Sequence, residues 1–385
     1  MGMEAILWPK CDSIGIYELD FALRFCLEKS KELTKVNAIT YDVREKIGSA
    51  ISHIRNYRRF IVVTEPLSVI SSTAGRLLLK YVKNDSVVAP VYNESGNSCQ
   101  LAQIPFPYFD IETFEEVSAI METRGELVKT DEIDSSCFAC SIDVLVANCD
   151  SKFTDIPMIA CNKYIHTGAL VHKFSNVFSS ERSDLAGLIP EDAQVILDVG
   201  CAAGGFGKAL MKKRCDVVID GVEMNEKLAL EAEKVYRRVY LGRFEEVEIS
   251  CGVYDAVNMG DVLEHMYDPW AAIGKVRSIL KCNGVLVGCV PNVAHWSIIR
   301  QLLSGQFEYI PVGLLCVSHI RFFTAQSLRK LFESHGFNVE VLEPREHPVT
   351  PSAQRFLEQM ESIGLSKDQV ANMLAAEIYF KVRKL

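Results

Sequence analysis

The chain has 385 residues with a net charge of −9, and 49% of its residues are hydrophobic and 24% charged. This length exceeds that of one typical domain, so we expect two. The negative charge argues against nucleic acid as a partner, and no apolar stretch is long enough for a membrane span. Thirteen scattered cysteines indicate reduced thiols, and the first residues lack a signal-peptide pattern, so we expect a cytoplasmic protein.

Residues 1–150 alternate apolar strands with amphipathic helices. This pattern predicts an α/β domain whose parallel sheet is covered on both faces. Residues 151–173 show no clear period and are expected to link the domains. The predicted strands are 5–8, 36–41, 60–63 and 87–92, and the predicted helices are 18–33, 44–55, 71–82 and 112–121.

One C-x-x-C motif lies in the first domain, at Cys137 and Cys140. No second C-x-x-C completes a zinc-binding spacing. We therefore interpret these two cysteines as buried strand residues and predict no metal, with a metal site as the alternative.

The strongest motif lies at residues 195–210, which read VILDVGCAAGGFGKAL. An apolar strand ends on Asp198, a turn of small residues follows, and a helix then begins. Such a corner places a nucleotide-like ligand across the strand ends of a doubly wound sheet. Neither register gives the dinucleotide pattern G-x-G-x-x-G, but Asp198, Gly200 and Gly204 fit D-x-G-x-x-x-G.

This pattern resembles the first motif of class I S-adenosylmethionine-dependent methyltransferases. The resemblance implies S-adenosylmethionine as cofactor, with the backbone of Gly200, Cys201, Ala202 and Gly204 against its methionine part and Asp198 helping to hold the ammonium. Ala202 stands where glycine is more usual, and its methyl group fits if the residue keeps a negative φ. An ordinary βα turn of another α/β protein is the alternative.

The second expected strand, 217–223, ends on Glu223, about 20 residues after the turn, where an acid accepts the ribose hydroxyls of an adenosine. Met224 is expected against the adenine, and Asn225 is expected to cap the next helix. A solvated strand-end acid is the alternative for Glu223. After the third strand, 238–241, Arg243 replaces the acid of many relatives, so the backbone at Phe244 is expected to contact the adenine.

From Tyr254 the sequence YDAVNMGDVLEHMYDPWAAIGKVRSILKCNGVLVGCVPN resembles the fourth and fifth strands of type 11 and 12 methyltransferases. The resemblance implies that Met259, Gly260 and Asp261 line the cofactor pocket. It predicts a Rossmann-like doubly wound sheet of seven strands over residues 174–385, with the last strand antiparallel. The remaining predicted elements are a helical lead-in at 174–188, helices 269–280 and 325–335, strands 285–290 and 337–342, a helical excursion to 377 and a last strand at 378–382.

Residues 291–324 resemble the substrate lid of methyltransferases found among genes for surface polysaccharides, although Leu315-Cys316-Val317-Ser318 replaces the usual Leu-Asp-Arg-Thr. Three histidines are expected near the mouth of the site: His265, His295 and His319. Histidine suits proton removal from a hydroxyl near neutral pH, so each is a candidate base. His319 comes first, because Arg321 beside it could bind an acidic sugar or phosphate.

Residues 60–92 and 131–145 resemble parts of a GT-A glycosyltransferase domain. Thr64-Glu65-Pro66 stands where such enzymes carry an Asp-x-Asp pair, and one carboxylate is a poor substitute for two metal ligands. We expect a related fold without that catalysis, serving substrate capture or homodimer formation. An unrelated α/β domain is the alternative.

Three functional hypotheses follow. The first is O-methylation of a sugar or glycosylated intermediate. The second is O- or C-methylation of a small aromatic or quinone-like acceptor in an apolar pocket of Trp296, Phe307, Phe322 and Phe323. The third is a non-catalytic binding or scaffold protein that keeps a relic cofactor site.

Overall fold

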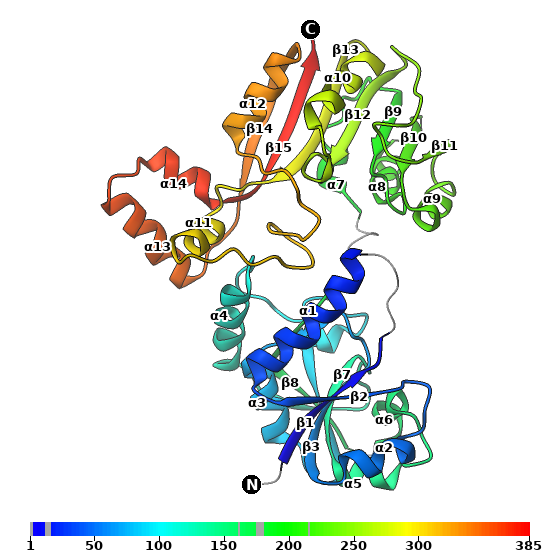
Figure 1. Ribbon diagram of the computed structural model, residues 1–385, viewed down its shortest axis with the longest axis vertical. Helices are drawn as coiled ribbons and strands as arrows, with labels where there is room; N and C mark the ends of the chain where they lie inside the picture. Colours follow the sequence, from blue (N-terminus) through cyan, green and yellow to red (C-terminus); the bar gives the residue numbers. More distant parts are fainter. Residues whose placement is uncertain (1–2, 12–16, 161, 175–180, 215) are drawn as a thin grey trace. The chain divides into compact units, whose positions relative to one another are not determined.

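The computed structural model describes residues 3–11, 17–160, 162–174, 181–214 and 216–385. The chain forms two compact units, Met1–Ser175 and Asn176–Leu385, and each is built around its own β-sheet (Figure 1). Within the described ranges, no helix is long and apolar enough to cross a membrane.

The first unit contains an eight-stranded mixed sheet. Its path is β2-β1-β3-β7-β5-β8-β4, with β6 paired to β8. Its elements are β1 (Met3–Pro9), α1 (Tyr17–Thr34), β2 (Asn37–Tyr41), α2 (Ile47–Ile54), β3 (Tyr57–Val63), β4 (Ser68–Ile70), α3 (Ser72–Tyr81), β5 (Ser86–Tyr92), η1 (Ser98–Gln100), α4 (Ile111–Glu122), β6 (Leu127–Thr130), β7 (Cys137–Ser141), α5 (Ile142–Ala147), η2 (Phe153–Asp155), α6 (Ile156–Ile159) and β8 (Asn162–Lys173).

The prediction of a parallel sheet in this unit is wrong. Strand β7 lies between β3 and β5 and runs antiparallel to both, and β4 and β6 run antiparallel to β8. An apolar run shows that a strand is buried on both faces, but it carries no signal for the direction in which the strand runs.

The predicted linker at residues 151–173 is also wrong, because β8 occupies its second half and pairs with β5 inside the sheet. The sequence NKYIHTGALVHK lacks a continuous apolar run, so its burial comes from its neighbours. Gly168 allows this close packing, since a Cβ there would lie 3.0 Å from the Cα of Glu122 in α4.

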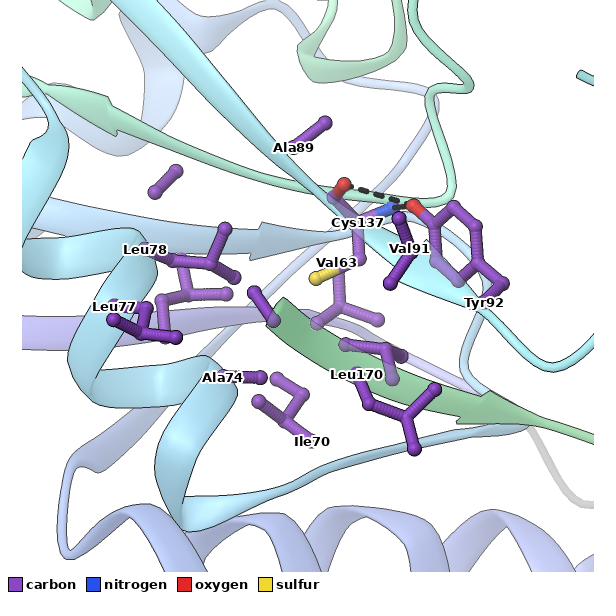
Figure 2. Packing of buried hydrophobic residues seen from close by; sticks show 14 of the residues in the cluster. Val63, Ile70, Ala74, Leu77, Leu78, Ala89, Val91, Tyr92, Cys137 and Leu170 are labelled. Atoms are coloured by element: carbon purple, nitrogen blue, oxygen red, sulfur yellow. Dashed lines mark hydrogen bonds between the residues drawn. The ribbon is translucent and has the colours of Figure 1, made fainter. Parts of the chain in front are cut away.

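Helices cover both faces of this sheet, as expected. Alternate residues of β1 point to opposite faces: Ile6 and Trp8 pack in the core beneath α1, α3 and α4, whereas Leu7 packs beneath α2, α5 and α6. Figure 2 shows part of the first core, where the Tyr92 hydroxyl donates to the Cys137 carbonyl at 2.9 Å and accepts from its N–H at 3.0 Å.

The second unit contains a seven-stranded sheet of order β11-β10-β9-β12-β13-β15-β14. Strand β15 lies between β13 and β14 and is antiparallel to both, and the other described pairings are parallel (Figure 1). Its elements are α7 (Ser183–Ala186), β9 (Val195–Val199), α8 (Gly205–Lys213), β10 (Val218–Glu223), α9 (Glu226–Ala232), β11 (Arg238–Leu241), β12 (Tyr254–Gly260), η3 (Leu263–His265), α10 (Pro269–Ile279), β13 (Leu280–Pro291), α11 (Trp296–Leu303), α12 (Ala325–Ser334), β14 (Phe337–Glu346), α13 (Pro351–Ser362), α14 (Lys367–Leu374) and β15 (Ala375–Lys384).

The elements expected in this unit lie close to their predicted positions. The sequence predicts a helix over residues 226–236, whereas α9 ends at Ala232. Asn225 caps it as expected, by accepting from the N–H groups of Lys227 and Leu228. Of the predicted helical lead-in, residues 175–180 lie outside the described residues, and α7 forms the part that is described.

Candidate functional site

The turn after β9 folds back over the end of β10. The N–H groups of Gly200 and Cys201 both donate to the carbonyl of Val222, at 2.9 and 3.1 Å. Gly200 and Gly204 have φ values of +68° and +81°, which glycine adopts without steric cost. The glycines of the motif are therefore required by the path of the backbone.

Ala202 departs from the expected backbone conformation. Its φ is +44°, whereas the methyl group was expected to fit with a negative φ, so that expectation is wrong. A left-handed conformation costs a residue with a side chain about 1–2 kcal/mol. The N–H of Ala202 donates to Glu223 Oε2 at 2.9 Å, and this charge-assisted bond stabilises the turn in that conformation.

Glu223 ends β10 with only 7% of its surface exposed. Its Oε1 accepts from the N–H of Asn225 at 2.8 Å, and its Oε2 accepts from Ala202. Each carboxylate oxygen can accept a further bond, so the group keeps capacity for two ribose hydroxyls. Met224 beside it is 66% exposed, and an exposed methionine at a strand end fits an adenine neighbour.

Asp198 lies on β9, the parallel neighbour of β10, so both acids lie at the carboxyl edge of the sheet. Asp198 is buried, and its oxygens accept from the Tyr236 hydroxyl at 2.5 Å and from Asn258 Nδ2 at 2.7 Å. Burial raises its pKa to about 6. These bonds tie β9 to its surroundings, and the contact of Asp198 with an ammonium stays a prediction.

The remaining predicted cofactor residues surround the same edge. Phe244 and Met259 are buried, and the Phe244 carbonyl accepts from Lys275 Nζ at 2.5 Å. Gly260 lies against Leu185, where a Cβ would approach the Leu185 Cδ1 to 2.3 Å. The main-chain carbonyl of Phe244 is thus engaged within the protein.

Asp261 follows β12 with a φ of +55° and forms an ion pair with Arg182. Arg182 also pairs with Asp184 at 3.0 Å, and the Tyr379 hydroxyl donates to the same carboxylate at 2.7 Å. Arg182, Asp184 and Tyr379 were not predicted from the sequence. Arg182 and Asp184 lie near the start of this unit's sequence and Tyr379 lies near its end, so no motif or spacing relates them.

The three candidate histidines differ in environment. His295 is fully buried and caps α11, with Nδ1 accepting from the Ser297 N–H at 3.3 Å. Burial lowers its pKa to about 3. Burial and the neighbouring His265 lower the pKa of His319 to about 4, whereas His265 is exposed. The rings of His265 and His319 meet edge to face, with centroids 4.8 Å apart.

The four aromatic residues expected in one pocket do not gather together. Trp296 packs in a core with α13 and α14, and Phe323 packs in the core of the main sheet. Phe307 and Phe322 are 38% and 39% exposed, and their ring centroids lie 6.0 Å apart. Tyr309, 5.4 Å from Phe307, joins them in an exposed aromatic cluster (Phe307, Tyr309 and Phe322).

In the first unit, Glu65 meets a buried lysine at the sheet edge. Lys173 Nζ lies 3.1 Å from Glu65 Oε2 and 3.0 Å from Asp134 Oδ2. Cys137 and Cys140 are buried in the cores on opposite faces of the sheet, so they cannot both bind one metal ion. Burial raises the pKa of Cys137 to about 12, which favours an inert thiol.

The second unit matches a known class of domain. Residues 170–342 match a family model described as a methyltransferase domain, and this range holds the turn, Glu223 and five of the seven strands of the sheet in full. This part of the chain is a class I S-adenosylmethionine-dependent methyltransferase domain with an α/β Rossmann-like fold. Its cofactor is S-adenosylmethionine.

Two curated relatives are O-methyltransferases. The ubiquinone biosynthesis O-methyltransferase of Dinoroseobacter shibae is 28% identical over 149 residues, which are 37% of this chain and 58% of that protein. The malonyl-[acyl-carrier protein] O-methyltransferase of Halalkalibacterium halodurans is 24% identical over 126 residues, 31% of this chain and 45% of that protein. The chain therefore spans about half the length of the curated relatives it matches.

Two solved structures are also similar. One is an S-adenosylmethionine dependent methyltransferase from Mesorhizobium loti, with a TM-score of 0.37 and 15% identity, covering 53% of this chain and 97% of that chain. The other is a methyltransferase from Archaeoglobus fulgidus, with a TM-score of 0.36 and 17% identity, covering 50% of this chain and 87% of that chain.

Proposed function

We propose that the chain is an O-methyltransferase that acts on a hydroxyl group of a small aromatic acceptor. The observation that best supports methyl transfer is the hydrogen bond between Ala202 and Glu223, which joins the glycine turn to the acid expected to bind a ribose. S-adenosylmethionine supplies an activated methyl group, so the chain has to position the acceptor and remove its proton.

The exposed aromatic cluster supports an aromatic acceptor. Phe307 meets both Tyr309 and Phe322 edge to face, and the three rings offer surfaces against which a flat molecule can pack. They lie in residues 291–324, the segment expected to form the lid. The names of the ubiquinone biosynthesis relatives agree with an acceptor of this kind.

A sugar hydroxyl is the second candidate acceptor. The resemblance of residues 291–324 to surface-polysaccharide methyltransferases supports it. Arg321, expected to bind an acidic group, instead donates to the backbone carbonyls of Ile320 and Tyr267, which weakens the case for an acidic sugar. We also propose a GT-A-like fold for residues 1–150, a homodimer and a cytoplasmic location.

We favour His265, the last residue of η3, and His319, whose ring contacts it, over His295 as the groups near the reacting hydroxyl. His295 serves as a helix cap, and its low pKa makes it a poor proton acceptor at neutral pH. The rings of His265 and His319 contact each other just beyond the end of β12. Burial also lowers the pKa of His319, to about 4, so we place proton removal at the exposed His265 of this pair. C-methylation is the alternative reaction at the same site.

The proposal is tested with radiolabelled S-adenosylmethionine and two panels of acceptors, catechol-type phenols and oligosaccharides. We expect transfer to the phenols, and replacing Phe307 and Phe322 with alanine is expected to raise the acceptor KM about tenfold, or about 1.4 kcal/mol. The matched control is Ile363→Ala, an exposed residue that follows α13. Transfer to glycans alone would replace the aromatic acceptor with a sugar.

Binding of S-adenosylhomocysteine separates the enzyme from the scaffold alternative. We expect a Kd tighter than about 100 μM, or about −5.5 kcal/mol, by calorimetry. Binding with no transfer to either panel would favour the scaffold, and absence of binding would remove the cofactor site itself.

A further inference from the structure

We propose that Glu264, His265 and His319 bind one divalent first-row cation of the Zn²⁺ or Mn²⁺ type. One ligand atom from each residue lies within 4.8 Å of the others. Two imidazoles and one carboxylate are a ligand set that such cations prefer. Binding of the cation stands on this geometry, and only its role toward the acceptor rests on the proposed function.

The buried carboxylate of Glu264 is the strongest observation. The residue is 1% exposed, and neither of its side-chain oxygens has a hydrogen-bond partner among the residues that the structure describes. Burying a carboxylate without donors is unfavourable by several kcal/mol, so such groups are paired, bind metals or take up a proton. Burial and the nearby Asp261 hold the pKa of Glu264 well above its usual range. A cation would give this carboxylate the partner that it lacks.

Both histidines are arranged as metal ligands commonly are. His319 Nδ1 lies 3.1 Å from the carbonyl of Leu314, and His265 Nδ1 lies 3.1 Å from the carbonyl of Ser318. An Nδ1–H that donates to a backbone carbonyl fixes the neutral tautomer with its lone pair on Nε2. The lowered pKa of His319 agrees with a neutral ring at pH 7.

The backbone holds the two parts of the site together. The N–H groups of Ile320 and Arg321 donate to the Glu264 carbonyl at 2.9 and 3.0 Å, so the residues after His319 are fixed against η3. Ligand atoms around a tetrahedral zinc ion are about 3.4 Å apart, given bonds of about 2.1 Å. The ligand atoms of Glu264, His265 and His319 lie within 4.8 Å of one another, so the widest separation would have to shorten by roughly 1.4 Å. His265, which is exposed, can supply this movement by a rotation of its ring.

Three protein ligands leave an open position on the cation. An acceptor hydroxyl bound there would lose its proton to solvent more readily, because the cation stabilises the oxygen anion. This arrangement would let His319, a weak base because its pKa is lowered, serve the reaction as a ligand rather than as a proton acceptor. His319 would then be a cation ligand, and methyl transfer would depend on the metal.

The test uses the full-length chain stripped with a chelator and titrated with MnCl₂ by EPR and with ZnCl₂ by calorimetry. We expect one saturable site per chain. Glu264→Gln and His265→Ala should each weaken binding about tenfold or more. Glu264→Gln keeps the size and shape of the buried side chain, and His265 is exposed, so both variants should fold. Glu248→Gln and His53→Ala, at exposed positions, are the matched controls and should bind as wild type does.

S-adenosylhomocysteine binding to every variant separates this proposal from the proposed function. We expect the same Kd in all of them, because the Glu223 carboxylate and the glycine turn are held by other residues. Absence of saturable metal binding, or equal binding in Glu264→Gln, would overturn the metal site. Metal binding without methyl transfer to any acceptor would leave the site standing and overturn the proposed function. Transfer that survives complete chelation would overturn the catalytic role of the cation.

Discussion

The N–H of Ala202 donates to Glu223 Oε2 across 2.9 Å, so the turn after β9 is bonded directly to the acid that ends β10. This bond explains two features at once. It orients the Glu223 carboxylate along the edge of the sheet, and it holds Ala202 in the left-handed conformation. The two parts of the proposed nucleoside site are therefore joined by one hydrogen bond.

Glu223→Ala is expected to weaken S-adenosylhomocysteine binding tenfold to a hundredfold. Hydrogen bonds to a charged group contribute about 1.5–3 kcal/mol, and the variant removes the acceptor of both ribose hydroxyls. Calorimetry measures the change. Glu226→Ala, an exposed acid three residues further on, is the control and should bind normally. An unchanged Kd in Glu223→Ala would show that the nucleoside lies elsewhere.

Gly207→Ala is expected to destabilise the second unit by about 1–3 kcal/mol, because overpacking forces neighbours apart. A Cβ at this position would lie 1.9 Å from the Tyr236 Cε1, and the Tyr236 hydroxyl bonds both Gly207 N and Asp198. Urea-induced unfolding measures the change in free energy.

The matched control for that variant should change stability in the opposite direction. Gly274 lies in α10, and a methyl group added there would have no described atom within 4 Å beyond its own helix and chain neighbours. Gly274→Ala should therefore stabilise the helix by about 0.5–1 kcal/mol. Equal effects of the two substitutions would contradict the packing of α8 against Tyr236.

Arg182→Gln is expected to lower the unfolding free energy by about 2 kcal/mol. It leaves the half-buried carboxylate of Asp261 without its cation, and it leaves Asp184 with only the longer 3.9 Å pair to Arg345. Arg329 pairs with Glu333 at the surface of α12 at 3.6 Å, and Arg329→Gln should cost less than about 0.5 kcal/mol. Urea titrations compare the two variants. A loss no larger in Arg182→Gln than in Arg329→Gln would argue against the network.

His295→Asn is expected to reduce the loss of stability in acid. The folded pKa of His295 is about 3, below its unfolded value of 6.5, so the unfolded chain binds more protons between these pH values. Stability that is present above pH 6.5 is therefore lost as the pH falls toward 3. Between pH 7.5 and pH 5 this residue contributes a loss of about 2 kcal/mol.

Asparagine keeps a side-chain acceptor at the start of α11 and removes the titrating ring, so the cap is preserved in the variant. Chemical denaturation at the two pH values gives the comparison, with His53→Asn as the exposed control. The same pH dependence in His295→Asn and wild type would place the acid sensitivity in other groups, of which half-buried His172 and buried His319 come first.

How much the sequence predicted differs between the two units. In the second unit, the strands from β9 to β15 follow apolar runs separated by clear turn residues, so their positions could be read directly. In the first unit, β8 was missed because its sequence has neither a continuous apolar run nor a regular alternation, and it becomes buried through pairing with β5. The direction of β7 was also missed, since strand direction depends on the connections and not on composition.

For the site, the sequence by itself determined the residues whose role depends on local spacing: the glycine turn, Glu223 about 20 residues after it, and the Asn225 cap. The tertiary structure alone decided which distant groups meet, such as Arg182 with Asp261, and Glu264 with His319. The physical reason is that local spacing constrains a turn or a cap, whereas long-range contacts depend on how the elements pack against one another. The backbone of Ala202 belongs to the second kind, because its conformation is set by a hydrogen bond to the next strand.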